Sequence, residues 1–255
     1  MITMNNTTVF ITGASAGIGE ATARVFAEAG ARLLLAARRL DRLKTLAAEL
    51  KTPVHCLALD VRNRAEVEQT IASVPPEFSR IDILVNNAGL SRNLDKLHEG
   101  DPAAWDEMID TNVKGLLYVT RAVLPGMVQR GKGHVINIGS IAGHQAYPGG
   151  NVYCASKHAV VGLTRGMRMD VIDTPIRVTA IEPGMVETEF SVVRFHGDTE
   201  RAGKVYEGVK PLTGRDVADA ILWAASRPEH VQIAEMVILP KDQAGSTIVH
   251  RRTDD

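Results

Sequence analysis

The chain has 255 residues, of which 45% are hydrophobic, and its 29 basic and 30 acidic residues give a net charge of -1. This length permits one large domain or two small ones, and the balanced charge gives no reason to expect binding to nucleic acid or to an anionic membrane. No apolar run reaches the roughly 18–20 residues of a membrane span, and the first residues lack the features of a signal peptide. We therefore expect a cytoplasmic protein without nucleic-acid or membrane partners.

Short apolar runs alternate with helical patterns along the chain. Strands are expected at residues 7–12, 33–36, 54–59, 83–85, 135–138, 178–181 and 231–239. Helices are expected after the first strand and at residues 40–50, 63–74, 103–129, 152–172 and 216–226, the third ended by Pro75-Pro76 and the fourth bent near Pro125. Residues 187–212 show no regular pattern. Repeated β-α-β units without a linker predict an α/β, Rossmann-like, doubly wound parallel sheet in a single domain over residues 1–255.

The first expected strand runs into the glycine-rich turn Gly13-Ala14-Ser15-Ala16-Gly17-Ile18-Gly19, and a helical pattern follows at once. Glycines let backbone N–H groups approach a pyrophosphate, and a helix N-terminus favours its negative charge. A tight turn without a ligand is the alternative. As a dinucleotide cradle, the turn would bind through Gly13, Ser15, Ala16, Gly17, Ile18 and Gly19.

The residues after the second and third strands predict which dinucleotide binds. Enzymes that use NAD place an acidic residue about 20 residues beyond the glycines, where it binds the ribose 2′-hydroxyl. This chain has Ala37 there, followed by Arg38 and Arg39. Guanidinium groups attract a 2′-phosphate, so we expect NADP(H), with a solvated basic turn as the alternative. Asp60 would then contact the adenine edge, and Val61 would pack on the ring.

Tyr153 and Lys157 stand four residues apart, which places a phenol and an ammonium on one face of a helix. A phenol has a reference pKa of about 10, and a lysine charge about 4–6 Å away can lower it by about 1–3, into the working range of an acid–base catalyst. Taken alone, the pattern also fits an ordinary helix with a half-buried tyrosine and a solvated lysine.

Together these motifs resemble the single-domain short-chain dehydrogenase/reductase family over nearly the whole chain. The resemblance implies that Ser140 binds the substrate oxygen, that Tyr153 transfers the proton, and that Lys157 binds the nicotinamide ribose. It also implies that Asn112 holds a relay water, although a helix-kinking role is the alternative. Further cofactor contacts implied by the family are Asn87, Ala88, Gly89, Pro183, Gly184, Val186 and Thr188. A dinucleotide-sensing regulator without turnover is a remote alternative, because such proteins usually lose the tyrosine or the lysine.

Residues 60–64 and 189–198 resemble the branch of NADP-dependent 3-hydroxy acid (serine) dehydrogenases, near sulfoacetaldehyde reductases. Two departures are Gln145-Ala146, where an aromatic-proline pair is usual, and the tail at 243–246. We expect a small 3-hydroxy acid such as serine or 3-hydroxypropionate, with sulfoacetaldehyde or a neutral ketone as alternatives. Residues 187–212 would form a substrate lid, in which Arg194 binds the acidic group unless it pairs with Asp198 or Glu200.

Two further expectations concern metals and assembly. Direct hydride transfer needs no metal, no His/Cys/Asp cluster has metal-ligand spacing along the chain, and His144 would be a wall of the cleft. A homotetramer is common in the family, and the helices expected at 103–129 and 152–172 carry apolar residues beyond one face. These residues are Leu116, Leu117, Val119, Val123, Val160, Val161 and Leu163.

Overall fold

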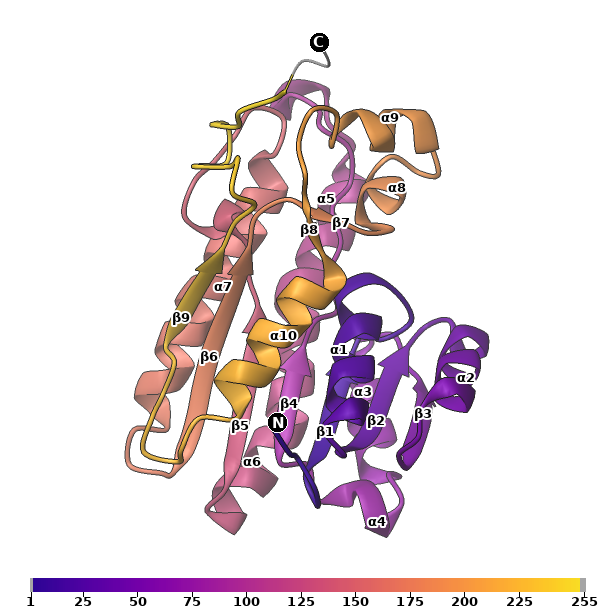
Figure 1. Cartoon of the computed structure of the whole chain (residues 1–255), viewed down its shortest axis with the longest axis vertical. Helices are drawn as coiled ribbons and strands as arrows, with labels where there is room; N and C mark the ends of the chain where they lie inside the picture. The colour runs from indigo at the N-terminus through magenta and orange to yellow at the C-terminus, as the bar shows by residue number, and fades with distance from the viewer. Residues whose placement is uncertain (1, 253–255) are drawn as a thin grey trace.

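The computed structural model describes residues 2–252, which form a seven-stranded sheet and the helices around it (Figure 1). Its strands are β1 (Thr8–Thr12), β2 (Arg32–Ala37), β3 (Val54–Ala58), β4 (Ile83–Asn86), β5 (Gly133–Ile138), β6 (Ile176–Pro183) and β9 (Glu235–Ile238). Their order is β3-β2-β1-β4-β5-β6-β9, and all neighbouring strands are parallel. The order reverses between β1 and β4, where an open α/β sheet binds ligands beyond the carboxyl ends of its strands.

Helices cover both faces of the sheet, and this explains why its central strands are apolar on both sides. One face packs against α1 (Gly17–Glu28), α2 (Leu40–Glu49) and α10 (Gly214–Ala225). The other face packs against α3 (Arg64–Ala72), α4 (Pro76–Ser79), α6 (Leu116–Arg130) and α7 (Asn151–Asp170). The doubly wound, Rossmann-like fold predicted from the sequence is confirmed.

Two of the expected helices end at other places than the sequence suggested. Pro76 does not simply end a helix but begins α4, because proline suits the first position of a helix, where its missing N–H is not needed. The helix expected at 103–129 is divided into α5 (Pro102–Ile109) and α6 by a π-helical turn, Asp110–Gly115. Pro125 lies inside α6, which continues to Arg130.

The segment expected to be irregular contains ordered elements. It begins in β7 (Val186–Glu187), forms α8 (Phe190–Arg194) and α9 (Thr199–Lys204), and ends in β8 (Leu212–Thr213), which pairs with β7. The Asp198 side chain accepts a hydrogen bond from the Arg201 N–H and so begins α9. Both helices lie beyond the carboxyl ends of the strands (Figure 1), where they can cover a ligand.

Between residues 2 and 252, no helix combines the length and the hydropathy that crossing a bilayer requires.

Candidate active site

A cleft of about 820 Å³ lies at the carboxyl ends of the strands. Its lining brings together nearly all of the residues that the sequence predicted for cofactor and substrate. They are Gly13, Ser15, Ala16, Gly17, Ile18, Arg38, Arg39, Asp60, Val61, Asn87, Ala88, Gly89, Ser140, Tyr153, Lys157, Pro183, Gly184, Val186, Thr188 and Arg194. Gly19 and Asn112 are the two predicted residues outside this lining.

The glycine-rich turn has the geometry of an anion cradle. Gly13 and Gly17 have φ angles of +65° and +58°, a backbone region that residues other than glycine rarely adopt. A Cβ at Gly19 would collide with the carbonyl oxygen of Gly13. Ala16 precedes α1 without a side-chain capping bond, so the first N–H groups of the helix remain available to a phosphate. The residues present therefore fit a dinucleotide pyrophosphate.

Asn87 connects this turn to the end of β4. Its Nδ2 donates to the carbonyl oxygens of Thr12 (2.9 Å) and Gly13 (3.1 Å). The Thr12 hydroxyl accepts in turn from the backbone N–H groups of Asn87 (3.1 Å) and Ala88 (3.0 Å). The amide of Asn87 thus positions the cradle, a role that its place in the cofactor motif does not reveal.

Arginine side chains gather beside the cradle. Arg39 donates to the Ser15 hydroxyl from Nε (3.3 Å) and Nη2 (3.2 Å) and pairs with Glu189 at 3.1 Å. Glu189, which directly precedes α8, also pairs with Arg42 from the first turn of α2. The guanidinium of Arg39 and the hydroxyl of Ser15 could hold a phosphate group together. Arg42 was not predicted as a site residue, although its position three residues after Arg39 places it close to Arg39 on the helix.

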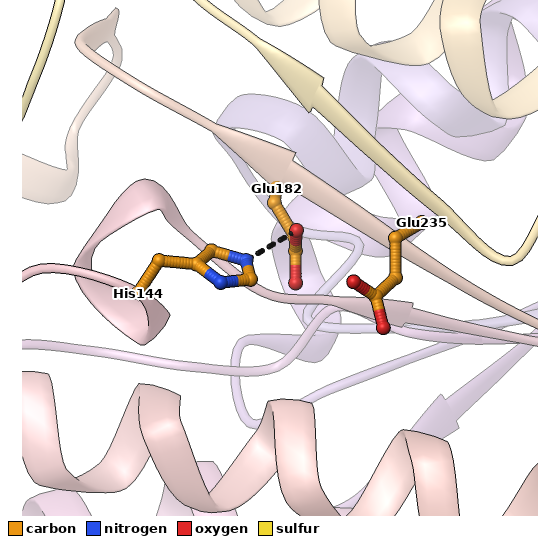
Figure 2. A group of neighbouring side chains, drawn as sticks. All are labelled: His144, Glu182 and Glu235. Atoms are coloured by element: carbon orange, nitrogen blue, oxygen red, sulfur yellow. Dashed lines mark hydrogen bonds and ion pairs between the residues drawn. The ribbon is translucent and has the colours of Figure 1, made fainter.

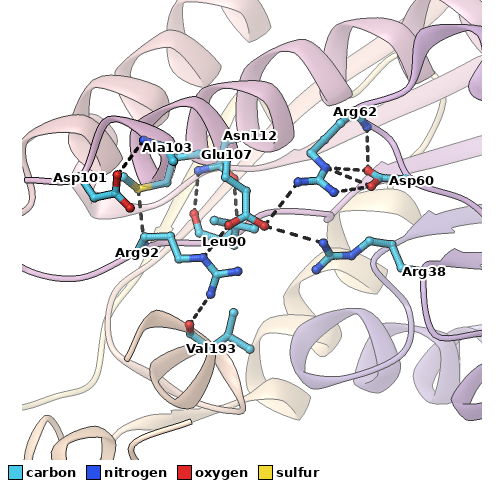
Figure 3. Close-up of polar contacts among 11 residues, drawn as sticks. Arg38, Asp60, Arg62, Leu90, Arg92, Asp101, Ala103, Glu107, Asn112 and Val193 are labelled. Carbon is cyan, nitrogen blue, oxygen red and sulfur yellow. Dashed lines mark hydrogen bonds and ion pairs between the residues drawn. The ribbon is translucent and has the colours of Figure 1, made fainter. Parts of the chain in front are cut away.

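Glu107 joins the rim of the cofactor site to the loop after β4 (Figure 3). Its carboxylate contacts Arg92 at 2.7 Å, Arg62 at 3.5 Å and Arg38 at 3.7 Å. Arg62 also binds the carboxylate of Asp60 at 2.6 Å, and this contact lowers the pKa of Asp60. Arg92 similarly lowers the pKa of Glu107. The Asp60 carboxylate thus already has a strong partner, so the contact with adenine expected of Asp60 stays a prediction.

Tyr153 and Lys157 lie on α7 and are both buried in the floor of the cleft. The Lys157 Nζ lies 5.9 Å from the centre of the Tyr153 ring and donates to the Ile138 carbonyl at 2.8 Å. Burial lowers the pKa of Lys157 to about 8. The Ser140 hydroxyl accepts from the Ala142 N–H at 3.1 Å and donates to the Pro183 carbonyl at 3.4 Å. Ser140 and Lys157 are therefore positioned by carbonyl groups at the ends of β6 and β5.

The electrostatics of Tyr153 differ from the expectation that Lys157 would depress its pKa. Burial raises the pKa of Tyr153, and the groups that oppose this rise are the charge of Arg194 and a hydrogen bond with Ser140. A buried phenol is harder to ionise because the low-dielectric surroundings disfavour the phenolate. In this structure, therefore, Arg194 and Ser140 favour the ionised form.

Asn112 lies in the π-helical turn behind the cleft. Its Oδ1 accepts from the Leu90 N–H at 2.8 Å, and its Nδ2 donates to the Leu90 carbonyl (2.8 Å) and to Ser156 Oγ (3.0 Å). The side chain thus anchors the loop after β4 to α7. The disturbed helix agrees with the structural role considered for Asn112, and its function in a proton relay stays a prediction.

Arg194 faces the cleft from the end of α8. Its guanidinium carbon lies 5.6 Å from the centre of the Tyr153 ring and 5.0 Å from that of Phe190. Its Nε is buried without a hydrogen-bond partner among residues 2–252, and no ion pair to Asp198 or Glu200 forms in that range. Asp198 instead caps α9, and Glu200 pairs with Lys204 at 2.7 Å. A partly desolvated guanidinium therefore lies beside Tyr153.

The cleft wall also contains Tyr147, which was not predicted, and part of the tail at 243–246 that the sequence marked as a departure from the family pattern. Tyr147 lies close enough to Arg194 for the guanidinium to favour its ionised form, although burial dominates and raises its pKa. Gln145 accepts a hydrogen bond from the Ser246 N–H at 2.8 Å, so the two departures from the family pattern contact each other. Gln243 accepts from the Met185 N–H at 2.8 Å, just after the Pro183-Gly184 turn. The tail thus forms part of the cleft wall through Gln243 and Ser246.

Comparisons with known proteins agree with this architecture. The sequence profile described as short chain dehydrogenase matches residues 7–198. The chain is 50% identical over 245 residues to the NADP-dependent 3-hydroxy acid dehydrogenase YdfG of Salmonella typhi, covering 95% of this chain and 99% of the relative. It is 44% identical over 257 residues to an NADP-dependent 3-hydroxy acid dehydrogenase of Schizosaccharomyces pombe, covering 99% of each protein. The structure of a closed form of serine dehydrogenase complexed with NADP+ matches with a TM-score of 0.92 and 47% identity, over 96% of this chain and 100% of the other. The chain therefore belongs to the short-chain dehydrogenase/reductase family.

Proposed function

We propose that the protein is an NADP(H)-dependent oxidoreductase that interconverts an alcohol and a carbonyl on a small 3-hydroxy acid such as serine or 3-hydroxypropionate. The named relatives support both the cofactor and the substrate class. Arg39 with Ser15, and Arg38 at the rim, provide cations and a hydroxyl for a 2′-phosphate. No acidic residue ends β2, where it would repel that phosphate.

In the proposed mechanism, the protein residues orient the substrate and move a proton, and NADP(H), when bound, supplies or accepts the hydride. The Ser140 hydroxyl orients the substrate oxygen. The Tyr153 phenolate would accept the proton of the alcohol during oxidation, and the Tyr153 hydroxyl would donate a proton to the carbonyl oxygen during reduction. Lys157, buried beneath the tyrosine, binds the nicotinamide ribose and keeps a positive charge near the phenol.

Arg194 is the residue that carries the assignment to an acidic substrate. Its partly buried guanidinium lies beside Tyr153, and its Nε has no hydrogen-bond partner among the described residues. The carboxylate of a bound 3-hydroxy acid would face Arg194, while the 3-hydroxyl of the same substrate would face Tyr153 and Ser140. Residues 187–212, with α8 and α9, would act as the lid that closes over this substrate.

A substrate panel with Arg194→Met tests this assignment. Losing a charge-assisted hydrogen bond costs roughly 1.5–3 kcal/mol, so kcat/KM for serine or 3-hydroxypropionate should fall about ten- to 150-fold. A neutral ketone should lose clearly less, because it loses only the influence of the Arg194 charge on the pKa of Tyr153. Arg201→Met is the matched control, because Arg201 packs on Phe195 at 4.3 Å in the same segment and does not line the cleft. Equal losses on acidic and neutral substrates would make Arg194 a folding residue of the lid.

Sulfoacetaldehyde is a second candidate substrate, favoured by the same Arg194 guanidinium, whose Nε, unpartnered among residues 2–252, would bind a sulfonate as readily as a carboxylate. The contact between Gln145 and Ser246 replaces the aromatic-proline pair usual in the branch and changes the cleft wall near the substrate. Higher kcat/KM with sulfoacetaldehyde than with any 3-hydroxy acid would establish this alternative. Binding of NADP(H) without turnover of any carbonyl or alcohol would instead favour the sensing regulator.

We also propose a cytoplasmic homotetramer. Most of the apolar residues expected to form its interface are, however, buried inside the chain. Five of the seven apolar residues named for the interface are buried within the chain: Leu116, Val119, Val123, Val160 and Val161. Exposed apolar side chains remain at Leu117 and Val128 of α6, at Met169 of α7, and at Ile172 just beyond it. A monomer mass by light scattering at micromolar concentration would contradict the tetramer, and cell fractionation tests the compartment.

A further inference from the structure

A second group of potential ligand atoms lies outside the cleft, formed by His144, Glu182 and Glu235 (Figure 2). His144 follows the short helical turn after Ser140, Glu182 lies near the end of β6, and Glu235 begins β9. One ligand atom from each residue lies within 4.8 Å of the other two. Because His144 faces this group, the expectation that it forms a wall of the active cleft is wrong.

Glu182 is the most unusual member of the group. Its side chain is fully buried, and its Oε2 lies 2.7 Å from the His144 Nε2. Its Oε1 has no hydrogen-bond partner within residues 2–252. Figure 2 shows its carboxylate between the imidazole of His144 and the carboxylate of Glu235. A buried carboxylate oxygen without a partner is strongly disfavoured, so this position favours an additional cation.

The protein provides only part of the compensating charge around these residues. Arg165 binds Glu235 from Nε at 2.7 Å and from Nη2 at 2.9 Å. Arg165 and the more distant Arg168 compensate Glu235, whereas no lysine or arginine among residues 2–252 forms an ion pair with Glu182. The His144 side chain is 30% exposed and that of Glu235 is 27% exposed, so an ion could enter from solvent and keep a water ligand.

We propose that His144 Nε2 and the carboxylates of Glu182 and Glu235 bind a zinc ion at this site. Imidazole nitrogen and carboxylate oxygen are both common Zn²⁺ ligands, at about 2.0–2.2 Å from the metal. Tetrahedral ligands at that distance lie about 3.3 Å apart. His144 and Glu182 are separated by 2.7 Å and no pair of these ligand atoms by more than 4.8 Å, so small side-chain movements would complete the geometry.

Zinc at this position would fix the backbone around Ser140. His144 lies four residues after Ser140, and Pro183, whose carbonyl accepts the Ser140 hydrogen bond, directly follows Glu182. Glu182 also packs tightly beneath Gly139, where a Cβ would lie 2.9 Å from its Cγ. The ion would join the loop after β5 to β6 and β9, and we expect it to stabilise the fold without entering the cleft.

The test uses full-length, tag-free protein treated with a chelator and titrated with Zn²⁺ by calorimetry and thermal unfolding. We expect one ion per chain and a rise in Tm. His144→Ala should weaken Zn²⁺ binding at least about tenfold, the scale of losses around metal sites. Arg165→Met should strengthen it, because Glu235 would be released from its competing partner. His98→Ala, at an exposed histidine that pairs with Glu99, is the control and should change nothing.

Two results would overturn the proposal. One is the absence of stoichiometric binding in the unmodified protein. The other is binding that neither His144→Ala nor Arg165→Met changes. Glu182→Gln is not used, because it alters a fully buried side chain and could prevent folding. His144 and Arg165 occupy exposed positions, so their variants test zinc binding at this site without that risk.

Discussion

Replacing Lys157 by methionine should separate two opposing contributions of this side chain to stability. Burial lowers the pKa of Lys157 from its ordinary 10.5 to about 8. At about 1.36 kcal/mol per pH unit, the charged lysine therefore costs the cofactor-free fold about 3 kcal/mol at pH 7. In the other direction, methionine removes the hydrogen bond to the Ile138 carbonyl, which costs about 1–3 kcal/mol. We expect Lys157→Met to be inactive but about 0–2 kcal/mol more stable near neutral pH.

The dependence on pH distinguishes the charge from the hydrogen bond. The unfolded chain keeps its proton up to about pH 10.5 and the folded chain only up to about pH 8, so the penalty is complete below pH 8 and is relieved as pH rises. The advantage of Lys157→Met should therefore shrink by about 2 kcal/mol between about pH 7 and pH 9.5. Urea unfolding followed by circular dichroism measures this change, with Lys51→Met as an exposed control. A difference between Lys157→Met and the unmodified protein that is the same at both pH values would refute the reasoning.

Two further predictions concern the reaction and the cofactor. Tyr153→Phe should lower kcat by about 10²–10⁴ while NADP(H) binding persists, because only the proton-transferring hydroxyl is lost. Steady-state kinetics measures the loss of kcat, and a fluorescence titration measures cofactor binding. Full activity of Tyr153→Phe would mean that another residue is the acid. Ala37→Asp combined with Arg38→Leu should sharply reduce the preference for NADPH over NADH, since a carboxylate would then face the 2′-phosphate. Equal kcat/KM for the two cofactors in the unmodified protein would contradict this second prediction.

Local sequence patterns were enough to predict the sheet and most of the cleft. Strands such as β1 and β2 are buried on both faces and therefore appear as continuous apolar runs. Since all seven strands are parallel, the polar residues that follow them meet at one edge, which explains why Ser140, Tyr153 and the glycine-rich turn line the same cleft.

Features that depend on contacts distant in sequence could not be predicted in this way. Glu107 binds arginines from three separate segments, and Asn112 in the π-helical turn is hydrogen-bonded to Leu90 and Ser156. His144 and Glu182 are 38 residues apart in the chain and meet only because β5 and β6 are neighbours. A search for ligand spacing along the sequence therefore missed the group that they form with Glu235.

The pairing of Glu189 with both Arg39 and Arg42 has a consequence for how cofactor affinity responds to salt. A 2′-phosphate that binds Arg39 through Nη1 would displace the Glu189 carboxylate, so one anion would be exchanged for another. Dissolved salt screens the arginine–glutamate pair as well as the arginine–phosphate pair, and the two effects partly cancel. Ionic strength should therefore affect binding of this phosphate less steeply than it affects a site with unpaired arginines. Because Glu189 directly precedes α8, the same exchange also frees one attachment of the segment that carries Arg194.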